Sequence, residues 1–350
     1  MPNMSCKAIV LAACLAQCLF ASPAMAEPFQ MHVTDVPLPD DEAKIRMGVQ
    51  LQARVLFQMK ELSQLNMMGR IYAGGVRTPA GTQKLQFFYN GLLDYAHSQL
   101  QSTSVPSDVK GWDALFRLTQ EWIDTAPSPT AYIALAKFHR ELAWQLRGPD
   151  TGDKMPAAAL EPFRKQMQIA HDILASHKAE AASDPEWYVT MEELACEQEW
   201  PEDSSKALYE EAMANNIYYD RVYYAIATRL EPVWGGTWEQ IERFADSAAR
   251  KTNDKLGDIL YARIYMWTAD CYCEAKDGKI WNWDRIKSSF QDLQSRYPDP
   301  WNDNKFAYYA CRQRDKAAAK DILGKLPRVI PSAWDDGDTS YEQCKAWVAT

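Results

Sequence analysis

The chain has 350 residues, of which 38 are Lys or Arg and 47 are Asp or Glu, giving a formal net charge of −9. An acidic surface repels nucleic acid and anionic membranes, which argues against both as partners. Hydrophobic residues make up 47% of the chain, which is typical of a folded protein and argues against disorder.

Residues 1–26 have the layout of a secretory signal peptide. Lys7 precedes an apolar run over 8–20, and Ala24-Met25-Ala26 forms an A-x-A cleavage site. The run is shorter than the about 20 residues that a membrane span needs. A lipoprotein signal ending at Cys14 and an uncleaved anchor are the alternatives, although cutting before Cys14 would leave a very short apolar core. We expect cleavage after Ala26, a bacterial periplasmic location, and no membrane span in the mature chain.

The N-terminal part of the mature chain is predicted in two pieces. Residues 27–43 are rich in proline and acidic residues and read as an extended lead-in. Residues 44–148 keep apolar side chains at helical spacing and form an N-terminal helical part. The longest connection in this part runs from Gly69 to Gly81 and is either a functional loop or a mobile surface connection.

A break over 148–153, Gly-Pro-Asp-Thr-Gly-Asp, separates this part from a C-terminal helical-repeat part over 154–350. Short connections make consecutive helices antiparallel neighbours. We therefore predict an all-α fold of antiparallel helix-hairpin repeats stacked as an α-solenoid of the tetratricopeptide type. The helices expected after residue 200 are Ala207–Ala214, Arg221–Leu230, Thr237–Lys251, Leu256–Ala275, Trp283–Tyr297, Asn302–Gln313 and Asp315–Leu326.

A structural corner is predicted where one helix ends and the next begins. Gly235 and Gly236 suit a sharp reversal because they lack a Cβ atom. Thr237 and Gln240 have the spacing of a capping box at the start of the next helix. Trp234 and Trp238 are expected to wedge this corner.

Aromatic residues near the corner are the candidate binding residues. They are Tyr218, Tyr219, Tyr223, Tyr224, Trp234 and Trp238. On one helix Tyr219 and Tyr223 share a face, whereas Tyr218 and Tyr224 point toward other faces, so the four tyrosines cannot all be buried equally. The 13 tryptophans of the chain can serve as sugar platforms, but wedges between stacked helices are the commoner use.

Five cysteines remain after export: Cys196, Cys271, Cys273, Cys311 and Cys344. An odd number cannot all pair within one chain, although disulfides persist in an oxidising compartment. Cys271 shares an apolar stripe with Trp267 and is expected to be a buried thiol. Cys344 is expected to pair with Cys311 or Cys273.

The sequence contains no catalytic or metal-binding motif. None of the five histidines forms H-E-x-x-H, and phosphate loops, dinucleotide fingerprints and G-x-S-x-G elbows are absent, so no metal and no cofactor are expected. The paired acids Glu192-Glu193 and Glu210-Glu211 read as solvated helix faces. The prediction is a non-catalytic binding protein, a scaffold or an inhibitor of an exported protein, whose partner is another protein. The alternative is a periplasmic α/α-toroid enzyme that acts on a glycan through two carboxylates.

The corner and the helices after it resemble a known family. The residues that carry the resemblance are Tyr224, Leu230-x-Pro-x-Trp-Gly-Gly-Thr, Phe244-Ala245, Trp283, Tyr297-Pro298, Phe306-Ala307, Ala310-Cys311 and Asp315. Over residues 160–330 the chain looks like a bacterial family of domains of unknown function, number four-zero-three-four, in the tetratricopeptide-like group. The resemblance implies an α-helical repeat fold and no established chemistry.

Overall fold

The computed structural model of the chain describes residues 42–101, 109–148, 160–271, 281–334 and 337–350. The described part is α-helical and contains no β-strand, which confirms the predicted all-α class. The predicted signal peptide over 1–26, the lead-in apart from its last two residues, the break after Gly148 and Cys273 lie outside the described residues.

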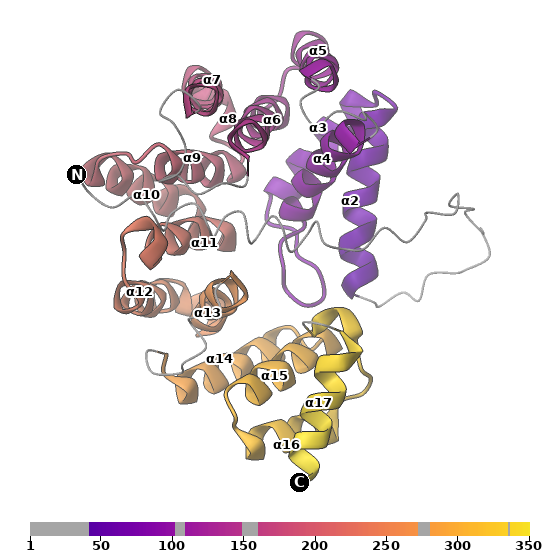
Figure 1. Cartoon of the computed structure of the whole chain (residues 1–350), viewed down its shortest axis with the longest axis vertical. Helices are drawn as coiled ribbons and strands as arrows, with labels where there is room; N and C mark the ends of the chain where they lie inside the picture. The colour runs from indigo at the N-terminus through magenta and orange to yellow at the C-terminus, as the bar shows by residue number, and fades with distance from the viewer. Residues whose placement is uncertain (1–41, 102–108, 149–159, 272–280, 335–336) are drawn as a thin grey trace, which may run out of the picture.

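Figure 1 shows the helices following one another around an arc, from α2 on the right, across the top and down the left side, to α17 at the bottom. Neighbours along the chain pack together, for example α2 on α4, α6 on α7, α12 on α13 and α15 on α16. The helices are α2 (Glu42–Gln58), α3 (Leu62–Ala73), α4 (Lys84–Gln101), α5 (Val109–Thr125), α6 (Pro129–Arg147), α7 (Glu161–Ser176), α8 (Lys178–Ala181), α9 (Glu186–Glu197), α10 (Glu202–Asn216), α11 (Asp220–Arg229), α12 (Trp238–Leu256), α13 (Ile259–Cys271), α14 (Trp283–Arg296), α15 (Pro300–Arg312), α16 (Lys316–Lys325) and α17 (Asp338–Ala349), with short 3₁₀ helices η3 (Pro232–Trp234) and η5 (Pro331–Ala333).

Capping residues and glycines set the ends of these helices. At the start of α6, the Ser128 side chain accepts a hydrogen bond from the Ala131 amide at 3.1 Å, and Pro129 occupies the first helical position. The predicted helix Leu256–Ala275 begins too early, because α12 runs on to Leu256. Gly257, at φ 57°, ends α12, and α13 begins at Ile259.

Large aromatic side chains fill the spaces between helices. The buried tryptophans are Trp112, Trp122, Trp144, Trp187, Trp281, Trp301 and Trp334. They support the interpretation of these residues as wedges between helices. Other described tryptophans are half-buried, and Trp267 is 37% exposed although it lies on an apolar stripe.

The connection between α3 and α4 is docked on the C-terminal half of the chain. Arg77 donates two hydrogen bonds to the carboxylate of Asp220, at 3.0 and 3.1 Å, and a third to the carbonyl of Tyr218 at 2.8 Å. The Ala80 carbonyl accepts a hydrogen bond from Arg263 at 3.2 Å. These polar contacts attach the connection to the C-terminal half of the chain and argue against a mobile surface loop.

Asp220 is the centre of this attachment because two arginines share its carboxylate. Arg263 also donates to it, and the side chains of Asp220 and Arg263 are 3% and 6% exposed. Burial pushes the pKa of Asp220 upward, but the charges of Arg77 and Arg263 outweigh it and lower the pKa. Asp220 is therefore held ionised between two guanidinium groups.

A disulfide joins Cys311 of α15 to Cys344 of α17; the two Cα atoms are 5.8 Å apart, and the two residues are 33 positions apart in sequence. It ties the last helix to the helix two before it. Cys196 is a free, buried thiol whose pKa is raised by burial. Within the described residues, no helix is both long and apolar enough to cross a membrane.

Candidate binding surface

The predicted corner lies between α11 and α12 and contains η3. Gly235 takes φ +92°, and a Cβ atom on Gly236 would overlap the backbone carbonyl of Leu230. Thr237 caps α12 by accepting a hydrogen bond from the Gln240 amide at 3.2 Å. Both glycines are therefore required, one by its backbone conformation and the other by lack of space.

The two corner tryptophans are half-buried, and both pack against the hydrophobic core. The indole nitrogen of Trp234 is buried and has no hydrogen-bond partner among the described residues. Trp234 and Trp238 therefore contribute mainly to the packing of the corner.

Two of the four candidate tyrosines are buried and cannot contact a partner. The Tyr219 hydroxyl donates to a carboxylate oxygen of Glu186 at 2.6 Å, and the Tyr223 hydroxyl donates to the carbonyl of Ile217 at 2.8 Å. Both bonds satisfy hydroxyls that have left water. Tyr219, the residue just before α11, and Tyr223 of α11 therefore both face the core.

The other two tyrosines are half-buried: Tyr224 lies on α11, whereas Tyr218 lies in the turn before it and not on the same helix. Tyr218 donates to Asp254 at 2.6 Å, and the ammonium group of Lys255 lies 4.1 Å from its ring centre. Tyr224 stacks on Trp267, with ring centres 5.1 Å apart and planes 10° apart. Trp267 also donates to the Thr228 hydroxyl at 2.9 Å, so this aromatic pair is held in place.

A network of ion pairs joins α6, α9 and α11. Arg140 of α6 donates to Glu197 of α9 at 2.8 Å, and Arg140 and Arg221 both lie 3.3 Å from Glu193. Lys137 pairs with Glu186 at 3.0 Å. Each carboxylate of this network thus has a cation beside it, which is the pattern of a structural ion-pair network.

The interpretation of Glu192-Glu193 as a solvated pair was wrong. The Glu192 side chain is fully buried and that of Glu193 is 20% exposed. Burial pushes the pKa of Glu193 upward, but Arg140, Lys137 and Arg221 outweigh it and hold the pKa at about 2. Burial raises the pKa of Glu192 to about 7, because only Arg229 opposes it and lies 3.8 Å away. Near neutral pH Glu193 is therefore ionised, whereas Glu192 is only partly ionised.

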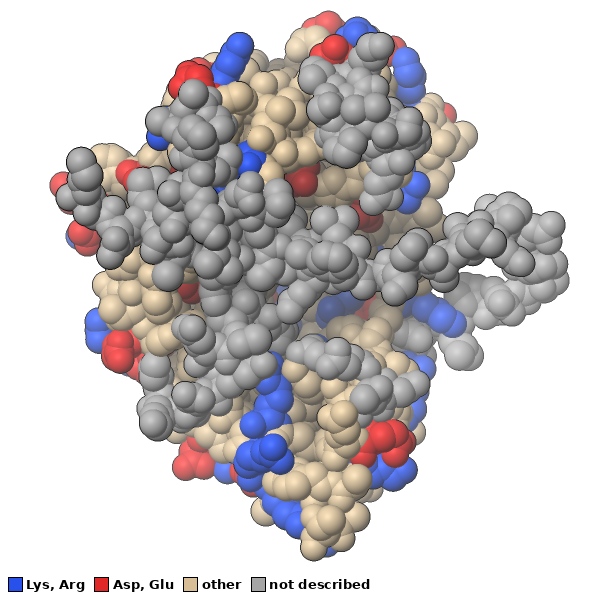
Figure 2. Space-filling model, in the orientation of Figure 1, with Lys and Arg blue, Asp and Glu red and all other residues tan. Residues whose placement is uncertain are grey.

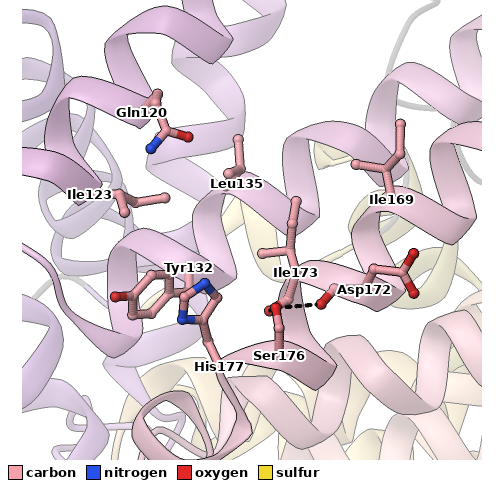
Figure 3. A pocket seen from close by; sticks show the side chains of 9 residues that line it. All are labelled: Gln120, Ile123, Tyr132, Leu135, Ile169, Asp172, Ile173, Ser176 and His177. Carbon is pink, nitrogen blue, oxygen red and sulfur yellow. Dashed lines mark hydrogen bonds between the residues drawn. The ribbon is translucent and has the colours of Figure 1, made fainter.

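A groove lies across α6, between α5 and α7 (Figure 3). Its volume is about 330 Å³, at the lower end of the about 300–1,000 Å³ that ligand sites occupy. The floor is formed by Tyr132 and Leu135 of α6, and both are buried. The walls are aliphatic: Ile123 comes from α5, and Ile169 and Ile173 come from α7.

Polar groups surround the mouth of this groove. Gln120 lies on the α5 side, and Asp172 and Ser176 lie on the α7 side, all three exposed. At one end, the ring of His177 stacks on Tyr132 with ring centres 3.8 Å apart. Hydrogen bonds from His171 and Gln168 lower the pKa of Asp172, so the rim carries a negative charge at neutral pH.

This arrangement can bind an apolar group and orient it through the rim. An apolar floor with a few polar groups around it is typical of sites for small ligands and for apolar side chains of a partner. Within the ranges that the structure describes, no group of three or more His, Cys, Asp or Glu residues could hold a metal ion. On the face shown in Figure 2, the coloured surface carries both signs of charge, and Lys and Arg are more prominent over the lower, C-terminal helices.

Sequence reasoning missed the groove. Its residues belong to three helices separated by loops, and each isoleucine reads as an ordinary core position of its own helix. The signal that could have shown it lies in α7, where Ile169 and Ile173 stand beside the buried stripe of Met167, Ala170 and Leu174. Together these residues make an apolar face that is wider than packing against one neighbouring helix requires.

The comparisons with known proteins do not connect the chain to a characterised relative. No family model, no curated protein and no solved structure matches the chain.

Proposed function

We propose that the protein is an exported, non-catalytic binding protein that holds an apolar segment of another protein in the groove between α5 and α7. The observation that carries the proposal is the groove itself, with an apolar floor, aliphatic walls and a polar rim. α5 and α7 flank α6 and leave a gap above it. An amphipathic helix or an extended segment can lay its apolar side chains in such a gap.

Export is supported by two features at opposite ends of the chain. The apolar run and Ala24-Met25-Ala26 have the form of a cleavable signal. The disulfide between Cys311 and Cys344 suits an oxidising compartment such as the bacterial periplasm. Mass spectrometry of the periplasmic protein should find Glu27 as the first residue, whereas a lipid on Cys14 would contradict this part of the proposal.

The fold proposed for this role is a stack of antiparallel helix hairpins of the tetratricopeptide type. Hairpins in such a stack present extended surfaces, because each pair buries one face against its neighbours and leaves the other free. The short connections and the packing of neighbouring helices support this proposal. The resemblance of the corner to the domain family number four-zero-three-four is consistent with it.

The ion-pair network argues against Glu192 and Glu193 as the two catalytic carboxyl groups of a glycan hydrolase. A hydrolase needs two accessible carboxyl groups on either side of its substrate. Glu192 has a raised pKa but is fully buried, and Glu193 is bound by arginines. Glycan turnover by the purified protein would overturn the proposal.

The experiment is quantitative capture of partners from periplasmic extract on immobilised mature protein. Ile173→Glu places a charge on the groove wall at a half-buried position and should weaken capture about tenfold or more, about 1.4 kcal/mol. Leu146→Glu is the control, since Leu146 is 42% exposed on the same α6 that forms the groove floor but is three turns from Leu135.

The same experiment distinguishes the groove from the aromatic residues. If Tyr218→Ala and Tyr224→Ala weaken capture and Ile173→Glu does not, the binding site is the aromatic surface beside α11. Melting temperatures of all variants are measured together, so that loss of folding is not mistaken for loss of binding.

A further inference from the structure

The groove between α5 and α7 is bounded at both ends by stacked rings. At one end, His177 stacks on Tyr132 with ring centres 3.8 Å apart. Toward the other end, His139 of α6 stacks on Phe116 of α5 with ring centres 4.1 Å apart, and a hydrogen bond of 2.7 Å joins it to Gln166 of α7. His139 thus bridges the two walls. Tyr132 and His139 are seven residues apart on α6, so the floor between them is about 10 Å long at 1.5 Å per residue.

The shape of the groove fits a helix better than an extended chain. α5 runs antiparallel to α6 because the connection over 126–128 is short, and α7 also runs antiparallel to α6, because Tyr132 contacts His177 whereas His139 contacts Gln166. The backbone groups of these helices are bonded internally, so an extended segment finds no strand edge to pair with. A helix satisfies its own backbone, and about two of its turns match the floor.

Carboxylates surround the Tyr132 end of the groove. Asp172 is 64% exposed and lies on the rim outside the aliphatic wall of α7. On the other rim, Gln120 donates to Asp124 at 2.8 Å, and Asp124 is exposed in the last turn of α5, next to the connection into α6. The Tyr132 hydroxyl donates to Glu180 of α8, which is also exposed. This end of the groove is therefore negative on both sides.

The basic side chains nearest this end leave the negative charge in place. Hydrogen bonds from His171 and Gln168 lower the pKa of Asp172, which keeps its carboxylate ionised at neutral pH. The ammonium group of Lys178 pairs with Glu211 of α10 at 2.7 Å. The charge of this lysine is thus directed at α10 and not at the groove.

Further along the same two rims the sign of the charge changes. Arg117 on α5 and Lys165 on α7 each lie seven residues before the rim aspartate of their own helix, Asp124 and Asp172, and both cations are exposed. Seven residues are two helical turns, so each cation lies on the same face as its aspartate. Carboxylates return one turn further on, at Asp113 and Glu161. Both rims are therefore negative around Tyr132 and positive toward the other end of the groove.

We propose that the segment bound in this groove is an amphipathic helix whose apolar stripe is flanked by Lys or Arg at the Tyr132 end and by Asp or Glu at the opposite end. The inference rests on the proposed function and adds the conformation and the charge pattern of the bound segment. Residues beside the apolar stripe of a packed helix face the rims of its neighbours, as the charged e and g positions of a coiled coil do. With this pattern both rims meet opposite charges, whereas the reverse pattern places like charges together.

The test uses two fluorescent synthetic peptides with the same leucine stripe, the same composition and zero net charge. One peptide carries its Glu residues in the N-terminal half and its Lys residues in the C-terminal half, and the other alternates them. Because neither peptide has a net charge, the acidic surface of the protein does not favour either. Fluorescence anisotropy with the mature, oxidised protein at low salt should show about tenfold tighter binding of the segregated peptide. The difference should shrink as salt is added, and circular dichroism checks that the two peptides have equal helix content.

The charge pattern is tested by exchanging the two charges of the α7 rim. The double variant Lys165→Glu, Asp172→Lys keeps the composition and should abolish the preference for the segregated peptide. The control is Asp321→Lys, Lys325→Glu on α16, whose side chains are 60% and 73% exposed and which contributes nothing to the groove lining. This exchange should leave the preference intact. Equal affinities of the two peptides for the parent, or a preference that survives the α7 exchange, would overturn the inference.

Ile173→Glu separates this inference from the proposed function. If both peptides bind the parent equally and Ile173→Glu abolishes their binding, the groove is a binding site but the charge pattern is wrong. If neither peptide binds, or if Ile173→Glu leaves their binding unchanged, the proposed function fails together with the inference. Binding of decanoate that Ile173→Glu removes, without binding of either peptide, would assign the groove to a small apolar ligand instead.

Discussion

Replacing Asp220 with asparagine should detach the connection between α3 and α4 from the C-terminal half of the chain. The substitution keeps the size of the side chain but removes the charge that Arg77 and Arg263 share. In asparagine an NH₂ group, itself a donor, replaces one carboxylate oxygen. The arginine that donated to this oxygen therefore loses its acceptor. The buried Arg263 and the half-buried Arg77 then remain without their counter-charge.

The magnitude follows from the burial of the group. The Asp220 side chain is 3% exposed and that of Arg263 is 6% exposed, so water screens the lost interaction very little. Breaking a buried ion pair by removing one partner costs about 3–5 kcal/mol. Set against a total stability of about 5–15 kcal/mol, this loss should be easily measured.

The assay is urea unfolding of parent and variant at pH 7, with Asp321→Asn as the control. Asp321 pairs with Lys325 on α16, but its side chain is 60% exposed, so its replacement should change stability by less than about 1 kcal/mol. Because the arginines lower the pKa of folded Asp220, its contribution is present above the unfolded pKa of about 3.9 and is lost as the pH falls through the folded pKa. The reasoning is refuted if Asp220→Asn and Asp321→Asn unfold at the same urea concentration at pH 7.

Three further results are expected. Gly235→Ala should destabilise by about 1–2 kcal/mol because of the positive φ at this position, and Gly236→Ala should destabilise more. The control Gly324→Ala in α16 should be neutral or stabilising, and equal melting temperatures of the three variants would contradict the tight corner. Thiol titration of the denatured, unreduced mature protein should leave Cys311 and Cys344 unlabelled, and reduction should cost about 2–4 kcal/mol; labelling of all five cysteines would disprove the bond. Glu192→Gln should stabilise the protein at pH 8 by up to about 3 kcal/mol, because a folded pKa of about 7 makes the buried carboxylate unfavourable above its unfolded pKa. The gain should vanish near pH 4, and a gain independent of pH would refute the raised pKa of Glu192.

Local signals allowed much of the secondary structure to be predicted from the sequence. Ser128-Pro129 predicted the start of α6, and Thr237 predicted the start of α12, because capping depends on residues a few positions apart. The join between α12 and α13 was misplaced. Leu256 fits the apolar pattern of either helix, and the left-handed conformation of Gly257 decides where the break falls.

Contacts between distant segments were beyond the sequence. Asp220 and Arg77 are 143 residues apart, and nothing local distinguishes either from a surface residue. Glu192 and Glu193 looked solvated for the same reason, since their burial depends on α6 and α11 packing against α9. The candidate groove likewise arises from three helices together.

Site-specific photocrosslinking in intact cells tests the binding account most directly. A photoreactive amino acid replaces Gln120 on the rim of the groove, and the control replaces Lys206, which is exposed on α10, a helix that contributes no residue to the groove lining. The account predicts a defined crosslinked protein from position 120, lost when Ile173→Glu is added, and none from position 206. Identical crosslinks from both positions, or a crosslink at position 120 that survives Ile173→Glu, would contradict it.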